Sequence, residues 1–217
     1  MTVVIAGAAP SRSTALADFQ RLRKQGSRDQ LLGAATEAFC ANGYFAVSVD
    51  EIASAAGVSR MTFYRHFSGK PAIASELFRQ NAEAAMPRLL AIGGRDFRDR
   101  KVVNDWIADI FAADRTRPQL LRVFIQANVA ESDFTETAHS FIADIISGLA
   151  ENMPAFALDR NHPPDRHRWL EAWLLIYEIL DQANHAARES GVATDPLIIE
   201  ILADRFIAFV SGDARRT

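Results

Sequence analysis

The stretch that most constrains the fold of this chain runs over residues 48–70 and reads SVDEIASAAGVSRMTFYRHFSGK. Ser48 is followed three positions later by Glu51, which is the spacing of a capping box. In that motif the hydroxyl satisfies a free N–H in the first turn of a helix, while the carboxylate reaches back to the N–H of the cap. Gly57 is expected to end this helix, because glycine readily adopts the left-handed conformation that a helix end often needs. The stretch therefore predicts a helix followed by a tight turn.

A second short helix is expected directly after the turn, with Ser59 as its N-cap. Helical spacing turns two aromatic residues toward a core, Phe63 and Phe67. The same spacing leaves a basic and polar face outside, made of Arg60, Met61, Thr62, Tyr64, Arg65 and His66. Two short helices joined by a glycine turn are typical of a helix-turn-helix, in which the second helix lies in the DNA major groove.

The pattern extends beyond this motif on both sides. An apolar-periodic helix and a glycine-aromatic turn precede it, with Leu31, Leu32, Ala35, Phe39, Asn42, Gly43, Tyr44 and Phe45. The motif itself supplies Ser48, Ile52-Ala53, Ala56-Gly57-Val58-Ser59, Tyr64-Arg65-His66-Phe67 and Lys70. Together these residues resemble the DNA-binding domain of the TetR family of transcriptional regulators. Pro71 departs from the family's usual acidic residue, and because proline is tolerated in a first helical turn, we expect only a shifted helix start.

The resemblance implies an all-α fold in three parts. Residues 1–25 are an N-terminal extension with room for one helix, and residues 26–70 are a three-helix helix-turn-helix domain. Residues 71–217 are a larger helical-bundle domain that dimerises and senses a small-molecule effector. The implied function is that of a regulator which binds a double-stranded DNA operator, most simply a repressor released by its ligand.

By the same resemblance, DNA contacts are expected from Ser48, Ser59, Arg60, Met61, Thr62, Tyr64, His66 and Lys70. Tyr64, His66 and Lys70, with Ser48, lie where the family binds phosphate. Arg60, Met61 and Thr62 lie where base edges are read. Phosphate contacts position a protein on DNA, while base contacts specify the sequence.

The charge of the chain is unevenly spread. The net charge is −3, but residues 1–80 hold nine Lys or Arg against six Asp or Glu, and residues 81–217 hold fifteen against twenty-one. The basic half coincides with the motif, and the local field is what a nucleic acid meets. No apolar run approaches the length of a membrane span, and the apolar opening lacks a basic start. With Cys40 as the only cysteine, no intrachain disulfide is possible, and the cytoplasm is the expected compartment.

Everything after Lys70 is expected to be helical. Apolar periodicity and breakers predict helices over about residues 71–90, 97–113, 118–128, 133–149, 164–189 and 195–210. Pro87 is expected to kink or end the first of these, and Asp133 to cap the fourth. Upstream, residues 1 to about 12 are expected to form a flexible tail, and Thr14–Lys24 a separate helix. That helix is either packed on the domain or a basic arm on the DNA backbone.

A stripe of amphipathic side chains recurs at four-residue steps on the long helix near the C-terminus: Trp173, Tyr177, Asp181 and His185. It is either the surface of an ordinary packed helix or one wall of a ligand cavity. Candidates for the other walls are Trp106, Phe124, Asn128 and His139. The resemblance favours the existence of a cavity but does not by itself assign its lining.

The last two expected helices are apolar on more than one face. The first carries Trp169, Leu170, Trp173, Leu174, Leu175, Ile176, Ile179 and Leu180, and the second carries Leu197, Ile198, Ile199, Ile201, Leu202, Phe206, Ile207, Phe209 and Val210. This exceeds one core-facing stripe. We therefore expect a homodimer held by these two helices and their symmetry mates, as TetR-like proteins use. The alternative is burial within one subunit.

A rival reading from another class is a helical-bundle enzyme that carries a DNA-binding appendage. Its best support is the E-x-x-H formed by Glu136 and His139, which can ligate a di-iron centre in helical bundles. Such a centre needs a second copy and further glutamates, and no second copy occurs. Ser68-Gly69-Lys70 lacks the upstream glycine of a phosphate loop. We therefore expect no catalytic residues, no metal and no cofactor.

Overall fold

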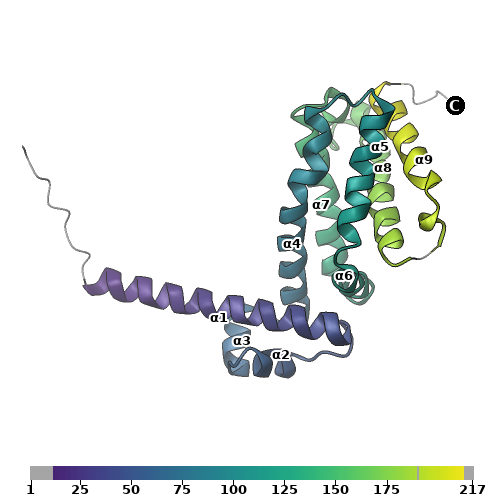
Figure 1. Cartoon of the computed structure of the whole chain (residues 1–217). Coiled ribbons are helices and arrows are strands. Elements are labelled where there is room, and N and C mark those ends of the chain that lie inside the picture. The colour runs from purple at the N-terminus through teal and green to yellow at the C-terminus, as the bar shows by residue number, and fades with distance from the viewer. Residues whose placement is uncertain (1–11, 190, 213–217) are drawn as a thin grey trace, which may run out of the picture.

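The structure is a computed structural model that describes residues 12–189 and 191–212, with side chains from Lys24 onward. All its regular elements in these ranges are helical, as expected (Figure 1). The α-helices are α1 (Arg12–Asn42), α2 (Val49–Ala55), α3 (Arg60–His66), α4 (Lys70–Leu89), α5 (Arg100–Asp114), α6 (Pro118–Ala130), α7 (Ser132–Ala150), α8 (Pro163–Ala187) and α9 (Leu197–Val210). Short 3-10 helices cover Leu90–Gly94, Pro154–Phe156 and Gly191–Thr194.

The helices form two packed units that share α4. The first places α2 and α3 beneath α1, and the second is an upright bundle of α4 to α9 (Figure 1). The N-terminal core takes Phe39, Ile52 and Phe63 from α1 to α3. It also takes residues from three later helices, namely Ile73, Ala74 and Leu77 of α4, Val123, Phe124 and Ala127 of α6, and Phe134 of α7. The N-terminal unit is therefore packed against the bundle through apolar contacts.

The bundle has its own core between α5, α7, α8 and α9. Trp106 of α5 lies 5.0 Å from Phe206 of α9 between ring centroids, and its indole N–H donates to the carbonyl of Arg88 at 3.1 Å. Six of the apolar residues of α8 and α9 that the sequence marked are buried here, namely Leu175, Ile176, Ile179, Leu202, Phe206 and Phe209, and several others are partly buried against this core. Part of the excess apolar surface of these helices is thus buried within one subunit.

The first helix differs from the expectation. Thr14–Lys24 is not a separate element, because α1 runs without a break from Arg12 to Asn42. Gly26 marks the expected boundary, but a single glycine inside a helix costs only about 1 kcal/mol relative to alanine and does not end it. The expected flexible tail falls mainly on residues 1–11, which lie outside the described residues.

Two smaller expectations about helix ends are also corrected. Asp133 does not cap α7, which begins one residue earlier with Glu131 in the cap position and no side-chain cap bond. Pro87 lies inside α4, which continues to Leu89. A proline so close to a helix end removes one backbone hydrogen bond without ending the helix at that residue. Pro71 occupies the first turn of α4, as expected.

Candidate DNA interface and effector cavity

The local geometry of the helix-turn-helix agrees with the expected capping. Ser48 N–H donates to Glu51 Oε2 at 2.7 Å, and Glu51 N–H donates to Ser48 Oγ at 3.2 Å. The bond from the Ser48 N–H, together with one from the Ser48 hydroxyl to the same carboxylate oxygen at 2.7 Å, lowers the pKa of the Glu51 carboxyl. Gly57 has a φ of +66° at the end of α2, and Ser59 Oγ accepts from the Thr62 N–H at 3.1 Å at the start of α3. Both serine hydroxyls therefore serve as caps beside the face that is expected to meet DNA.

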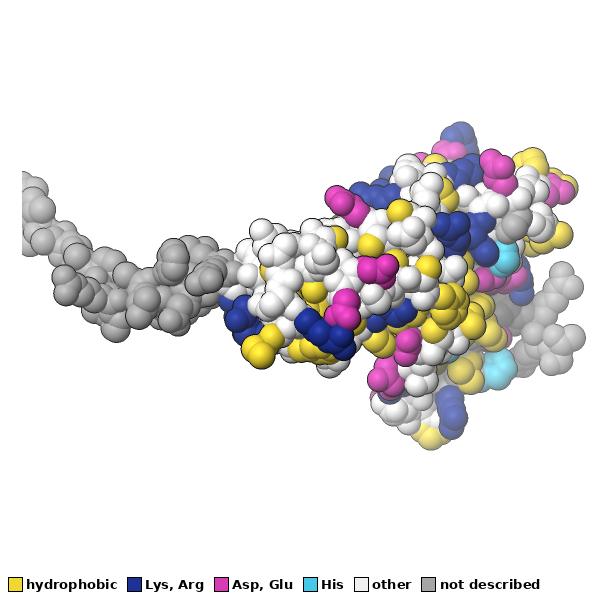
Figure 2. Space-filling view, turned by 90° about the horizontal axis from the view of Figure 1, so that it is seen from below, with side chains coloured by type: hydrophobic (Ala, Val, Ile, Leu, Met, Phe, Trp, Pro, Cys, Tyr) yellow, Lys and Arg dark blue, Asp and Glu magenta, His cyan; other side chains and the backbone are white. Residues whose placement is uncertain are grey.

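The outer face of α3 is open to solvent. Met61 is 83% exposed and Tyr64 is 46% exposed. Figure 2 views this end of the molecule from below and shows hydrophobic side chains there beside Lys or Arg and Asp or Glu. Such a mixture of cationic, apolar and hydroxyl groups on a protruding helix fits the contact chemistry of a DNA groove.

Arg60 is already engaged in the free protein. Its Nη1 lies 2.8 Å and 2.6 Å from the two carboxylate oxygens of Asp50 on α2. Its guanidinium carbon also lies 5.5 Å from the ring centroid of Tyr64. Asp50 is the first cause of a raised pKa at Arg60. Arg60 is thus held across the gap between α2 and α3, in a defined position on the open face.

Lys70 and His66 lie at less exposed places than the sequence suggested. The Lys70 ammonium donates to the carbonyl of Tyr44 at 2.9 Å and lies 4.4 Å from the Tyr44 ring centroid. Burial lowers the pKa of Lys70. The His66 Nε2 atom is buried without a hydrogen-bond partner. Burial, followed by the charges of Arg65, Lys24 and Arg28, lowers the pKa of His66.

The turn between α1 and α2 is hydrogen-bonded to the bundle. The sequence pattern did not indicate this contact. The Tyr44 N–H donates to Gln126 Oε1 of α6 at 2.7 Å, and the Tyr44 hydroxyl donates to Glu131 Oε1 at 2.8 Å. Burial and the neighbouring Glu131 raise the pKa of the tyrosine hydroxyl. Gly43 has a φ of +85°, and a Cβ there would lie 3.1 Å from the Gln126 side chain. The glycine-aromatic signature is therefore also the docking point of α6.

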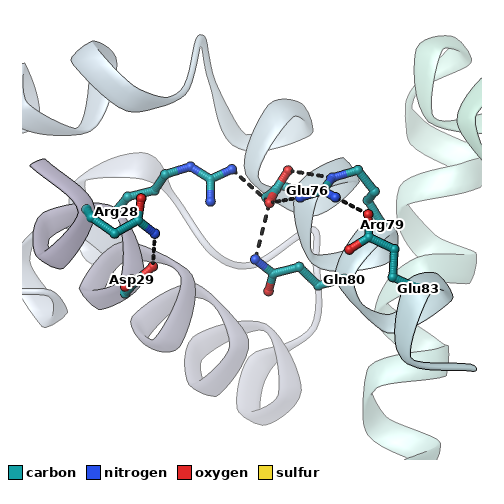
Figure 3. Close-up of polar contacts among 7 residues, drawn as sticks. Arg28, Asp29, Glu76, Arg79, Gln80 and Glu83 are labelled. Carbon is teal, nitrogen blue, oxygen red and sulfur yellow. Dashed lines mark hydrogen bonds and ion pairs between the residues drawn. The ribbon is translucent and has the colours of Figure 1, made fainter. Parts of the chain in front are cut away.

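An ionic network centred on Glu76 joins α1 and α4 (Figure 3). Arg28 of α1 lies 2.8 Å from Glu76 Oε1, and Arg79 donates to both Glu76 oxygens. Arg79 also pairs with Glu83. The hydrogen bond from Arg79 is the first cause that lowers the pKa of Glu76 to about 2, with Arg28 contributing. The network braces α1 against α4.

A cavity of about 530 Å³ lies between the helices of the bundle and is partly open to solvent. Five of the expected ligand residues are among its lining, namely Phe124, Asn128, His139, Tyr177 and Asp181, and His185 also lines it. Further walls come from α4, α5 and α7, including Phe78, Arg88, Asp114, Phe134 and Phe141. Nothing in the sequence pattern marked Asp114 or the residues of α4, because their convergence depends on how the helices cross.

Trp106 and Trp173 are not part of this lining. Trp106 is only 2% exposed and fills the core between α5 and α9. Trp173 lies behind the wall, where its ring stacks on Tyr177 at 5.2 Å and meets His139 edge-on at 5.1 Å between centroids. The placement of a cavity at Trp106 is therefore corrected, and Trp173 supports two lining residues from the side.

The profile of bacterial regulatory proteins of the tetR family matches residues 31–77. Residues 31–77 therefore form a TetR-type domain. FasR of Mycolicibacterium smegmatis, an HTH-type transcriptional activator, is 52% identical over 50 residues, which are 23% of each chain. TcmR of Streptomyces glaucescens, an HTH-type transcriptional regulator, is 43% identical over 65 residues, 30% of this chain and 29% of TcmR. The chain thus matches less than a third of the length of these curated relatives.

Solved structures of TetR-type and other regulators share the fold of the larger part of the chain. A regulator from Streptomyces coelicolor superposes with a TM-score of 0.61 at 20% identity, over 82% of this chain and 97% of that one. FadR, a fatty acid degradation regulator from Bacillus halodurans, gives 0.55 at 15% identity, over 81% and 93%. At these identities the likeness shows the fold alone. The TetR profile ends at Leu77, within α4, whereas the N-terminal core also includes residues of α6 and α7.

The remaining sequence motifs do not assemble a second site. Glu136 and His139 lie on α7, and over residues 12–189 and 191–212 no group of three or more His, Cys, Asp or Glu side chains is placed to hold a metal ion. Among the same residues, no helix combines the length and the apolar character that crossing a membrane requires. The described residues therefore offer no set of metal ligands in support of the alternative hypothesis, a metal-dependent bundle enzyme.

Proposed function

We propose that this protein is a sequence-specific DNA-binding transcriptional regulator, a repressor that a small molecule in the bundle cavity releases from its operator. The observation that carries the proposal is the open face of α3, where Arg60, Met61 and Tyr64 stand exposed on a capped and braced helix-turn-helix. In this arrangement Tyr64 contacts the DNA backbone. Arg60, Met61 and Thr62 contact the base edges. Lys70 would have to share its ammonium between phosphate and Tyr44.

The cavity has a direct physical connection to the DNA-binding unit. Phe124 and Phe134 belong to the N-terminal core and also line the cavity. Phe78 of α4 meets both rings edge-on, each at 5.3 Å between centroids. A ligand that moves these rings would shift the base of α4 and the docking of α6 on Tyr44. In the repressor mechanism, the ligand favours a conformation whose two reading helices no longer fit successive major grooves.

The proposal includes a homodimer through α8 and α9. Four large apolar residues on these helices remain exposed in the subunit, Leu170, Leu174, Leu197 and Ile201. They lie at four-residue steps on each helix, which places each pair on one face. These helices lie on the side of the bundle opposite the free end of α1 (Figure 1). A two-fold axis there would present two α3 helices to one stretch of DNA.

The decisive experiment selects an operator from random DNA and compares its affinity with that of scrambled DNA at several salt concentrations. A specific regulator binds the selected sequence at least about a thousandfold more tightly than scrambled DNA, with an affinity that falls steeply as salt rises. Equal affinity for the two DNAs would contradict the proposal. Because FasR is named an activator, a reporter driven by the selected operator measures whether this protein lowers or raises transcription.

A further inference from the structure

One part of the cavity wall is aromatic. Phe78, Phe124, Phe134 and Phe141 converge on it from α4, α6 and α7, with Tyr177 on α8. Phe78 lies 5.8 Å from Phe141 between ring centroids and packs edge-on against it. Aromatic faces carry a negative quadrupole, so a wall of this kind favours apolar bodies and tolerates a nearby cation.

The charged and titratable groups in the lining come mainly from four helices. They are Arg88 of α4, Asp114 of α5, His139 of α7, Tyr177, Asp181 and His185 of α8, and Arg188 directly after α8. Most of the groups on α8 and directly after it are already paired. Asp181 lies 3.8 Å from His185 Nε2, and Arg188 bonds the Asn184 carbonyl and the His185 ring. Two charges are left, Arg88 and Asp114.

Asp114 differs from Arg88 in its surroundings. Arg88 is exposed, so water solvates its guanidinium. Asp114 is half-buried, and among the described residues no hydrogen bond or ion pair reaches its carboxylate. Burial raises the pKa of this carboxyl to about 6. The positive charge of Arg88 acts in the opposite direction but does not bring the pKa back to its usual value. An unpaired carboxylate that is partly removed from water is costly, and a cation beside it removes that cost.

The position of Asp114 on its helix reinforces this preference. Asp114 is the last residue of α5. The carbonyl end of a helix carries a partial negative charge, which adds to the carboxylate and attracts cations. The Asp114 carboxylate, the carbonyl end of α5 and the aromatic faces all contribute a negative potential. They do so beside an apolar wall.

We propose that the cavity takes an amphipathic cation, with an ammonium group at the Asp114 carboxylate and an apolar body against the phenylalanine wall. This inference rests on the proposed effector site and specifies its ligand class. It makes Asp114 the specificity-determining residue, since the apolar wall accepts alcohols, amines and acids of the same tail alike.

The test uses three probes that share a tail and differ in the head group: decylamine, decanol and decanoate. Calorimetric titration of the full chain without DNA at about pH 7.5 should show decylamine binding at least about tenfold more tightly than the other two. Asp114→Asn should remove about tenfold of the decylamine affinity and leave decanol unchanged. Asp109→Asn is the matched control, because Asp109 is an exposed residue of the same helix that does not line the cavity.

The pH dependence supplies an independent readout. A cation needs the ionised carboxylate, so decylamine affinity should fall about tenfold from pH 7.5 to about pH 5, as Asp114 protonates around pH 6. Protonation of His139 and His185 would also weaken the binding of a cation. The pH dependence of decylamine affinity that remains in Asp114→Asn measures this contribution of the histidines. Preferential binding of decanoate, an unchanged decylamine affinity in Asp114→Asn, or no binding of any probe would each overturn the proposal. Because no DNA is present, none of these results bears on operator binding, which the operator titration tests alone.

Discussion

At the scale of single residues, Arg60 has two competing partners, the Asp50 carboxylate in the free protein and the DNA in the proposed complex. In the free protein its guanidinium is shared with the Asp50 carboxylate, and both side chains are largely exposed. An exposed pair of this kind contributes little stability, so DNA can displace it at low cost. If Arg60 reads bases, as proposed, Asp50 would favour its placement over the bases and oppose its contact with the phosphates.

We therefore expect Arg60→Ala to lose about 1–3 kcal/mol of discrimination between operator and scrambled DNA, if Arg60 pairs with a base. Asp50→Asn should instead raise affinity for both DNAs, because it removes a negative charge and frees the guanidinium for phosphates. Titration of both DNAs at one salt concentration measures the two effects. Glu83→Gln, on the exposed side of α4, is a charge-matched control. An equal loss on both DNAs in Arg60→Ala would assign Arg60 to a phosphate.

The residue scale also shows which features can be predicted from sequence. The capping box at Ser48 and the turn at Gly57 depend on neighbours within four positions, so their geometry follows from local sequence. The bonds of Lys70 and Glu131 to Tyr44 join residues that are 26 and 87 positions apart. These contacts depend on the packing of α4 and α6, and no local pattern signals them.

At the scale of elements, α4 connects the two units. Its first turns lie in the N-terminal core, its middle lines the cavity, and Glu76 ties it to α1. The expected boundary at Lys70 marks the start of this helix well, but the packing continues past it. A boundary read from sequence follows the motif, whereas a packed core follows the helix that both units share.

The Glu76 network predicts a pH-dependent stability. The pKa of Glu76 is depressed in the folded state, so its stabilising contribution is present above the unfolded pKa of about 4.5 and is lost as the pH falls toward about 2. Glu76→Gln should therefore lower the free energy of unfolding by on the order of 1–2 kcal/mol at pH 7, and wild type and variant should converge in acid.

Urea denaturation at pH 7 and about pH 2 measures this convergence. Glu83→Gln is the matched control, because Glu83 pairs with the same Arg79 but its side chain is mostly exposed. A constant difference between wild type and Glu76→Gln at both pH values would show that the loss comes from packing and not from charge.

At the scale of the whole molecule, the subunit leaves an apolar face on α8 and α9 after its own core is complete. The exposed residues differ from those that fill the core. Leu202 is 2% exposed, so a charge at this position would disrupt the subunit itself. Leu174 and Ile201 are 59% and 51% exposed and are the proper sites for testing the interface.

We expect Leu174→Glu or Ile201→Glu to convert the proposed dimer into folded monomers and to reduce operator affinity by at least about a hundredfold, since each half-site would then bind alone. Sedimentation at micromolar concentration, with circular dichroism to confirm folding, measures the first effect. Val129→Glu places the same charge at an exposed apolar residue of α6 and should leave the dimer intact. A wild-type protein that sediments as a monomer would refute the interface.

The two phenylalanines that belong to both the N-terminal core and the cavity wall, Phe124 and Phe134, have a consequence for hydrogen exchange. A ligand that packs on these rings adds its binding energy to the unit formed by α1, α2 and α3, so amides in these helices should exchange more slowly when the cavity is filled. Linkage then works in reverse: whatever factor the ligand imposes on operator affinity, the operator must impose on ligand affinity. A protein molecule seated on DNA would thus sense its ligand at a different concentration from a free one.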